Sequence, residues 1–107
     1  MERIAFQLKL KDGKLMEYKA RHDNIWPEMI HVLNEAGIKN YTIWNSGEKL
    51  FGYYEVADSL HSNLILASSP VIERWNQYMD EVIEYNIDEK TGTIAEMTKV
   101  FEFNLNQ

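Results

Sequence analysis

The sequence predicts an α+β domain in which helices cover one face of a four-stranded antiparallel sheet. Several segments have the alternating or aromatic-rich composition of half-buried strands, and the segments between them repeat apolar residues at helical spacing. The predicted order is strand, helix, two strands as a hairpin, a helical pair and a last strand. This order matches the ferredoxin-like split βαβ plan. The 107 residues fit one domain over residues 1–107.

The first half of the chain supplies a strand and an interrupted helix. Residues 3–10 alternate apolar and polar side chains, which predicts a half-buried strand. From Lys14 to Leu33 the apolar residues recur at helical spacing, and Gly37 stands where a helix C-cap glycine would. Pro27 cannot continue a helix without a clash, so we expect a kink there or a second segment with Pro27 in its first turn.

The middle of the chain predicts a β-hairpin. Residues 39–44 and 50–56 are rich in aromatic and β-branched side chains, and residues 45–49 between them form a short polar turn.

The second half predicts two helices and the last strand. Asp58 or Ser59 caps a short helix that runs through Ala67, and Pro70 begins a second helix that extends to about Ile83. Residues 84–94 form a loop and residues 95–103 the last strand. The sheet face without helices then needs a cover. In so small a chain the usual cover is a second copy, giving a homodimer with sheets packed face to face, the dimeric α/β-barrel assembly.

Composition excludes several function classes. The chain has no cysteine, which rules out disulfides, thiolate metal sites and a thiol nucleophile, and favours a cytoplasmic location. Its start lacks the apolar run of a signal peptide, and we expect no membrane contact. The net charge is −6 and no basic cluster is denser than residues 9–11, so we expect no nucleic-acid partner. A neutral small molecule is compatible with this charge.

One group of side chains has the chemistry for proton transfer. Tyr18, His22 and Trp26 are spaced four apart, which places a phenol, an imidazole and an indole on one side of a continuous helix. Imidazole titrates near neutral pH, so it can donate a proton and take it back. The same spacing is also typical of simple core packing, and spacing alone favours that interpretation. His31 and His61 have no comparable context, and we expect both at the surface.

Further aromatic residues could line a binding site or fill the core. Tyr41 and Trp44 have opposite parity on their strand, so only one of them can face the helices. Trp75 offers an indole for stacking, and Asn76 beside it offers an amide that both donates and accepts hydrogen bonds. No recognised metal-ligand spacing, nucleophile elbow or glycine-rich phosphate loop is present, so we predict neither a metal nor a phosphate-bearing cofactor.

Longer strings of residues point to a family. Residues 17–28 read EYKARHDNIWPE and residues 37–44 read GIKNYTIW. Together with Arg74-Trp75 and Tyr78-Met79, they closely resemble the L-rhamnose mutarotase family over nearly the whole chain. The string Tyr-x-x-Arg-His-x-x-Ile-Trp-Pro-Glu is long and made of uncommon residues, so it is far more specific than any single spacing.

The resemblance implies a function and a set of site residues. It implies that the protein interconverts the α and β anomers of L-rhamnose, or of a related 6-deoxyhexose, with no cofactor, and that His22 is the proton donor. It also implies that Tyr18, Tyr41 and Trp75, with the residue at position 76, bind the sugar. The usual pattern has a second Trp at this position, where the present chain has Asn76. That exchange leaves the preferred sugar open, and L-fucose is an alternative.

The hypothesis for the reaction is that protonated His22 donates to the ring oxygen, the open aldehyde turns about its C1–C2 bond, and closure reverses the proton transfers. The general base is not identified, because Tyr18, Tyr41 or an ordered water could serve. Asp23 and Glu28 are candidates to orient His22. Two other classes stay open at this point: a dimeric α/β-barrel monooxygenase or haem-binding protein, and a non-catalytic sugar-binding module.

Overall fold

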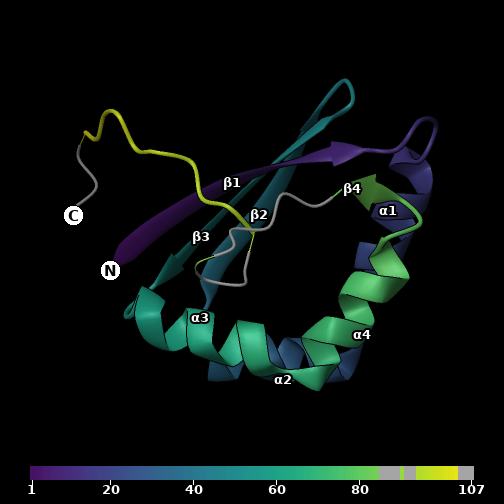
Figure 1. Ribbon diagram of the computed structural model, residues 1–107. Coiled ribbons are helices and arrows are strands. Elements are labelled where there is room, and N and C mark those ends of the chain that lie inside the picture. Colours follow the sequence, from purple (N-terminus) through teal and green to yellow (C-terminus); the bar gives the residue numbers. More distant parts are fainter. Residues whose placement is uncertain (85–89, 91–93, 104–107) are drawn as a thin grey trace.

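The computed structural model describes residues 1–84, 90 and 94–103. In chain order the elements are β1 (Glu2–Leu10), α1 (Leu15–Asp23), α2 (Pro27–Glu35), β2 (Lys39–Ser46), β3 (Lys49–Val56), α3 (Ser59–Ser68), α4 (Pro70–Met79) and β4 (Ile83–Glu84) (Figure 1). The helices gather on one side of the sheet (Figure 1). This arrangement confirms the predicted α+β class.

The sheet has the strand order β2-β3-β1-β4, and every neighbouring pair is antiparallel. This is the ferredoxin-like order, in which β1 and β3 are the two central strands. Alternate residues of both central strands are buried under the helices, with Phe6 paired opposite Gly52 and Ile4 opposite Tyr54. The period-2 pattern of residues 3–10 therefore predicted the correct face.

The helix break lies where Pro27 predicted it. α1 ends at Asp23, and α2 begins with Pro27 as its first residue, because a first-turn position requires no backbone N–H donor. α2 ends before Gly37, whose φ of 75° is the left-handed conformation of a helix stop. The break turns the chain just after His22, so Tyr18 and His22 lie in the last two turns of a short helix.

The hairpin and the starts of α3 and α4 agree closely with the sequence prediction. The hairpin strands continue further than expected, and the turn shrinks to Gly47 and Glu48. Asp58 caps α3 by accepting hydrogen bonds from the backbone N–H groups of Leu60 and His61. Ser69 caps α4 in the same manner, directly before Pro70.

The predicted last strand over residues 95–103 is wrong for the residues that the structure describes. The fourth strand is Ile83–Glu84, and the later segment makes an isolated bridge between Phe6 and Glu96. Correspondingly, α4 ends at Met79 and not near Ile83, because the chain turns after Met79 and then pairs with β1. The backbone N–H of Lys11 donates to the Val82 carbonyl, and Leu10 pairs with Ile83. The expected loop over 84–94 lies mostly outside the described residues.

No helix in the described part of the chain combines the length and the apolar character that crossing a bilayer requires.

Candidate active site

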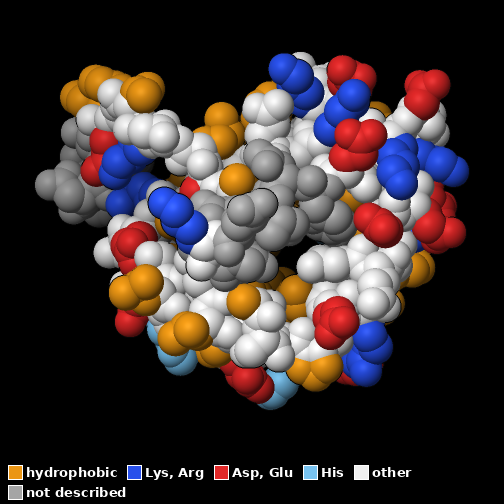
Figure 2. Space-filling model, in the orientation of Figure 1, with side chains coloured by type: hydrophobic (Ala, Val, Ile, Leu, Met, Phe, Trp, Pro, Cys, Tyr) orange, Lys and Arg blue, Asp and Glu red, His pale blue; other side chains and the backbone are white. Residues whose placement is uncertain are grey.

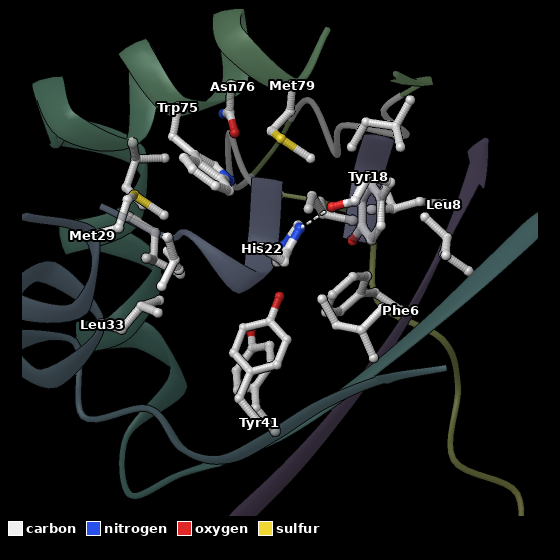
Figure 3. Close-up of a pocket in the computed structure, with 18 of the residues that line it drawn as sticks. Phe6, Leu8, Tyr18, His22, Met29, Leu33, Tyr41, Trp75, Asn76 and Met79 are labelled. Atoms are coloured by element: carbon white, nitrogen blue, oxygen red, sulfur yellow. Dashed lines mark hydrogen bonds between the residues drawn. The ribbon is translucent and has the colours of Figure 1, made fainter. Parts of the chain in front are cut away.

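A cavity of about 870 Å³ lies between the inner face of the sheet and the helices. This volume is in the usual range for small-molecule sites. Its lining includes every residue that the sequence predicted for the site, namely Tyr18, His22, Tyr41, Trp75 and Asn76 (Figure 3). Three separate elements, α1, β2 and α4, thus bring the predicted side chains to one cavity.

His22 stands between two aromatic rings. Tyr18 precedes it by one helical turn, and the two ring centroids are 4.4 Å apart at an interplanar angle of 34°. The ring of Trp75 meets His22 from α4 with centroids 5.4 Å apart and the ring planes nearly perpendicular, at 87°. The imidazole is half-buried and forms part of the cavity wall (Figure 3). It is therefore held by packing and still faces a space that a ligand can enter.

A hydrogen bond assigns roles to the two ring nitrogens of His22. Nδ1 lies 3.3 Å from the carbonyl oxygen of Tyr18, drawn as a dashed line in Figure 3, and it donates to that oxygen. Because a carbonyl oxygen can only accept, this contact favours the tautomer with its proton on Nδ1 and leaves Nε2 as the nitrogen that gains and loses a proton. Burial lowers the pKa of His22 below its usual 6.5, and the Tyr18 carbonyl and the Asp23 carboxylate oppose this effect more weakly.

The two tyrosines approach from opposite sides of the cavity. Tyr18 is buried in α1, and burial raises the pKa of its phenol well above the usual value, so the hydroxyl stays protonated. Tyr41 comes from β2, and its ring extends toward His22 (Figure 3). It packs on Tyr54 with centroids 5.3 Å apart and on the edge of Phe6 at 6.1 Å. A protonated phenol can serve here as a hydrogen-bond donor.

The parity prediction for β2 is confirmed. Tyr41 faces the helices, whereas Trp44 is 68% exposed.

Trp26 lies elsewhere than its spacing suggested. The helix ends before it, and Trp26 is not among the described residues that line the cavity. Its ring instead meets Trp75 at 89° with centroids 5.1 Å apart and stacks on Tyr78 at 5.4 Å. Trp26 therefore supports Trp75 from behind. Asn76 follows Trp75 on α4 and points its amide into the cavity (Figure 3).

Neither carboxylate that was considered for orienting His22 does so directly. Asp23 forms an ion pair with Lys19 at 2.7 Å, and Glu28 pairs with Arg74 at 2.9 Å. The backbone carbonyl of Tyr18, one helical turn before His22, contacts its Nδ1 at 3.3 Å and takes the orienting role.

Arg21 is a supporting residue that the sequence analysis did not identify. Its side chain is 12% exposed, stacks 4.2 Å above the ring of Tyr78 and donates to the Tyr78 carbonyl near the end of α4. It also pairs with Glu17 and Glu81, each at 3.0 Å. These contacts tie α1 to α4 and so fix His22 relative to Trp75. Its place beside His22 in the Arg-His pair was the only signal in the sequence.

The other histidines lie where they were expected. His31 is exposed and contacts Glu35, and His61 is exposed on α3. Within residues 1–84, 90 and 94–103, no three His, Cys, Asp or Glu side chains are grouped closely enough to hold a metal ion.

Comparisons with known proteins point to one family. A family model described as L-rhamnose mutarotase matches residues 3–103. The L-rhamnose mutarotase of Jannaschia sp. (strain CCS1) is 38% identical over 104 residues, covering 94% of this chain and 97% of the relative. That of Sinorhizobium fredii is 41% identical over 90 residues, covering 82% of this chain and 86% of the relative.

Solved structures give the same result. The crystal structure of L-rhamnose mutarotase from Formosa agariphila superposes with a TM-score of 0.77 at 26% identity, covering 97% of this chain and all of that one. Tetracenomycin F2 cyclase from Streptomyces glaucescens, at 14% identity and a TM-score of 0.61 over 96% of this chain and 99% of its own, shares the fold. The family match over nearly the whole sequence decides the assignment, and the chain belongs to the L-rhamnose mutarotase family.

Proposed function

We propose that this chain is an isomerase that interconverts the α and β anomers of L-rhamnose, with His22 as the proton donor. The observation that carries the proposal is the position of His22, half-buried in the wall of an 870 Å³ cavity between Tyr18 and Trp75. The activity for which the relatives are named supports the same function.

The cavity has surfaces suited to both the polar hydroxyls and the apolar parts of a 6-deoxyhexose. Tyr18, Tyr41 and Asn76 bring groups that bond to sugar hydroxyls, and Trp75 offers an indole to the apolar face of the ring. The inner face of the sheet and the helix ends add an apolar wall, formed by Ile4, Phe6, Leu8, Leu50, Met79 and Ile83. An apolar wall suits a methyl group at C6 better than the hydroxymethyl group of an ordinary hexose.

The reaction requires one proton to be added and one to be removed. Nε2 of protonated His22 donates to the ring oxygen while the anomeric hydroxyl loses its proton, the bond from C1 to the ring oxygen breaks, and the open aldehyde results. After rotation about C1–C2, the hydroxyl formed from the ring oxygen attacks the opposite face of the C1 carbonyl. The proton transfers then run in reverse: this hydroxyl returns its proton to Nε2 of His22, and the new anomeric oxygen regains one. A positioned general acid contributes about 10²- to 10⁴-fold in rate, which suits a reaction that already proceeds in water.

Tyr18 is assigned to binding and not to the role of base. Its raised pKa makes loss of the phenolic proton unfavourable near neutral pH.

Asn76 keeps L-fucose as a second candidate substrate, because an amide at this position can bond to a hydroxyl that an indole leaves unrecognised. We also propose that the protein works as a homodimer in the cytoplasm.

The experiment is anomer exchange followed by NMR saturation transfer with L-rhamnose and with L-fucose. Wild-type protein should accelerate exchange of L-rhamnose, and His22→Ala should lose about 10²-fold or more of that acceleration. His61→Ala changes an exposed histidine on α3 and serves as the matched control. Failure of the wild type to accelerate either sugar would refute the function. Full activity of His22→Ala would refute the assignment of His22.

A further inference from the structure

Asn40, directly before Tyr41, has an unusual backbone conformation. Its φ of 53° is left-handed, and it is the one residue other than glycine with a positive φ in the described part of the chain. The pairing of β2 with β3 shifts between Lys39 and Thr42, so three steps along β2 match two along β3. The strand therefore contains a β-bulge at Asn40 and Tyr41. Bulges beside functional sites commonly redirect a side chain.

A polar network on the far side of the sheet holds this bulge. Asn40 donates from Nδ2 to Oε1 of Glu55 at 2.5 Å, and the hydroxyl of Tyr53 donates to Oε2 at 2.8 Å. Nε of Arg3 lies 3.6 Å from the same carboxylate. The hydrogen bonds from Asn40 and Tyr53 hold the pKa of Glu55 below its ordinary range, so the carboxylate remains a charged acceptor.

The other side of the bulge faces the cavity. Tyr41 lies there against Phe6 and Tyr54, with its ring directed toward His22 (Figure 3). The Glu55 network and the cavity thus lie on opposite sides of the same backbone segment, residues 40–41. A change in the φ of Asn40 would rotate the peptide that carries Tyr41.

We propose that Asn40 is a positioning residue for Tyr41: its left-handed backbone and its hydrogen bond to Glu55 hold the bulge that turns the Tyr41 phenol into the cavity. The inference rests on the proposed role of Tyr41 in sugar binding. Asparagine suits the position because it tolerates the left-handed conformation better than most residues and also supplies the amide donor.

Two substitutions separate backbone conformation from hydrogen bonding. Asn40→Gly keeps access to a positive φ but loses the amide, whereas Asn40→Ala loses both. We expect Asn40→Ala to raise the KM for L-rhamnose about three- to tenfold, the range that one lost hydrogen bond produces. Asn40→Gly should raise it less. An ordinary strand position would rank the two the other way, since glycine weakens strands more than alanine does. That reverse ranking would overturn the proposal.

A second comparison ties the effect to Tyr41. In a Tyr41→Phe background, Asn40→Ala should change KM by less than about twofold, because the hydroxyl that it positions is already gone. An undiminished effect there would contradict the proposal. Asn34→Ala, at an exposed asparagine of α2, is the matched control and should leave KM unchanged.

A further variant keeps the test decisive if Asn40→Ala does not fold. Glu55→Gln keeps the side-chain shape but weakens the acceptor for Asn40, and it should raise KM in the same direction. An unchanged KM in Glu55→Gln would argue against the network. If Tyr41→Phe itself leaves KM unchanged while wild type is active, the binding role of Tyr41 is wrong and the inference falls with it. If Tyr41→Phe raises KM and no Asn40 variant does, the inference alone is wrong.

Discussion

Tyr18 shows how burial determines a residue's role. Tyr18 is 5% exposed, and burial raises the pKa of its phenol, so the phenol acts in the cavity as a donor. Tyr18→Phe should raise the KM for L-rhamnose about three- to tenfold and leave the shape of the pH–rate profile unchanged. Tyr78→Phe, which removes a hydroxyl outside the cavity, is the control. Loss of one limb of the pH profile in Tyr18→Phe would instead identify this tyrosine as the general base.

Asn76 is the residue on which sugar preference should depend. It lines the cavity beside Trp75, and its amide can bond to a hydroxyl whose orientation differs between deoxyhexoses. Asn76→Trp should shift the ratio of kcat/KM for L-rhamnose over L-fucose, because a ring replaces the amide. The measurement is the exchange rate of each sugar over a concentration series. An unchanged ratio would show that position 76 does not set the preference.

At the scale of elements, the two central strands depend on one glycine. Phe6 on β1 is paired with Gly52 on β3, and its ring lies over the glycine. A Cβ added at Gly52 would lie only 2.0 Å from the nearest ring carbon of Phe6. Phe6 also packs against Tyr41 and Tyr54, so it cannot move without disturbing the cavity wall.

Gly52→Ala should therefore lower the free energy of unfolding by about 1–3 kcal/mol, the usual cost of overpacking a core. Urea denaturation measures the change. The double variant Gly52→Ala with Phe6→Leu supplies the control, because the smaller side chain makes room for the new methyl group. It should be more stable than the sum of the two single changes predicts. Strict additivity would show that the ring and the glycine are not coupled.

The sequence predicted most elements because their signals are local. Alternation in residues 3–10, Pro27, Gly37 and the Ser69-Pro70 pair each act on their own segment, and the structure confirms all of them. The end of α4 and the fourth strand could not be predicted in this way. Val82 continues the helical spacing of α4, yet pairing with β1 draws the chain into a strand from Ile83. Tertiary pairing here overrides local periodicity.

The candidate site was predicted for a different reason. Spacing alone predicted Trp26 and His22 on one side of a continuous helix, whereas the helix ends before Trp26. Spacing alone also favoured a packing role in the core for His22. The family resemblance supplied a set of residues that all line one cavity. What no sequence pattern indicated is the support around that set: the ties of Arg21 to α4, the room that Gly52 makes for Phe6, and the left-handed Asn40. Each depends on contacts between segments far apart in the chain.

At the scale of the whole molecule, the sheet face away from the helices carries a mixed apolar and polar surface. It includes Ala5, Gln7, Thr42, Trp44, Phe51 and Tyr53. Trp44 is 68% exposed there. The described chain after Glu96 also has exposed apolar side chains, with Val100 at 92% and Phe101 at 78%. Hydrophobic side chains gather at the upper left of Figure 2, over this end of the chain. Burying such a surface is the physical reason to propose a homodimer.

Sedimentation velocity should accordingly show a dimer at micromolar concentration, and Phe51→Lys should shift it toward monomer. Leu64→Lys places the same charge at a 72% exposed leucine on α3 and should leave the dimer intact. A dimer that dissociates with Leu64→Lys and survives Phe51→Lys would place the interface on the helices instead. A wild-type monomer would refute the assembly altogether.

The most direct test of His22 as a proton donor compares its titration with the rate of the reaction. NMR of the imidazole protons gives the pKa of His22, which burial should hold below 6.5. Anomer exchange of L-rhamnose is measured over the same pH range and corrected for the rate without protein. Since the protonated form donates, the enzymatic rate should fall about tenfold per pH unit above this pKa and level off below it. A rate that falls as the pH is lowered through the pKa of His22 would contradict the account, because the neutral imidazole would then be the active form.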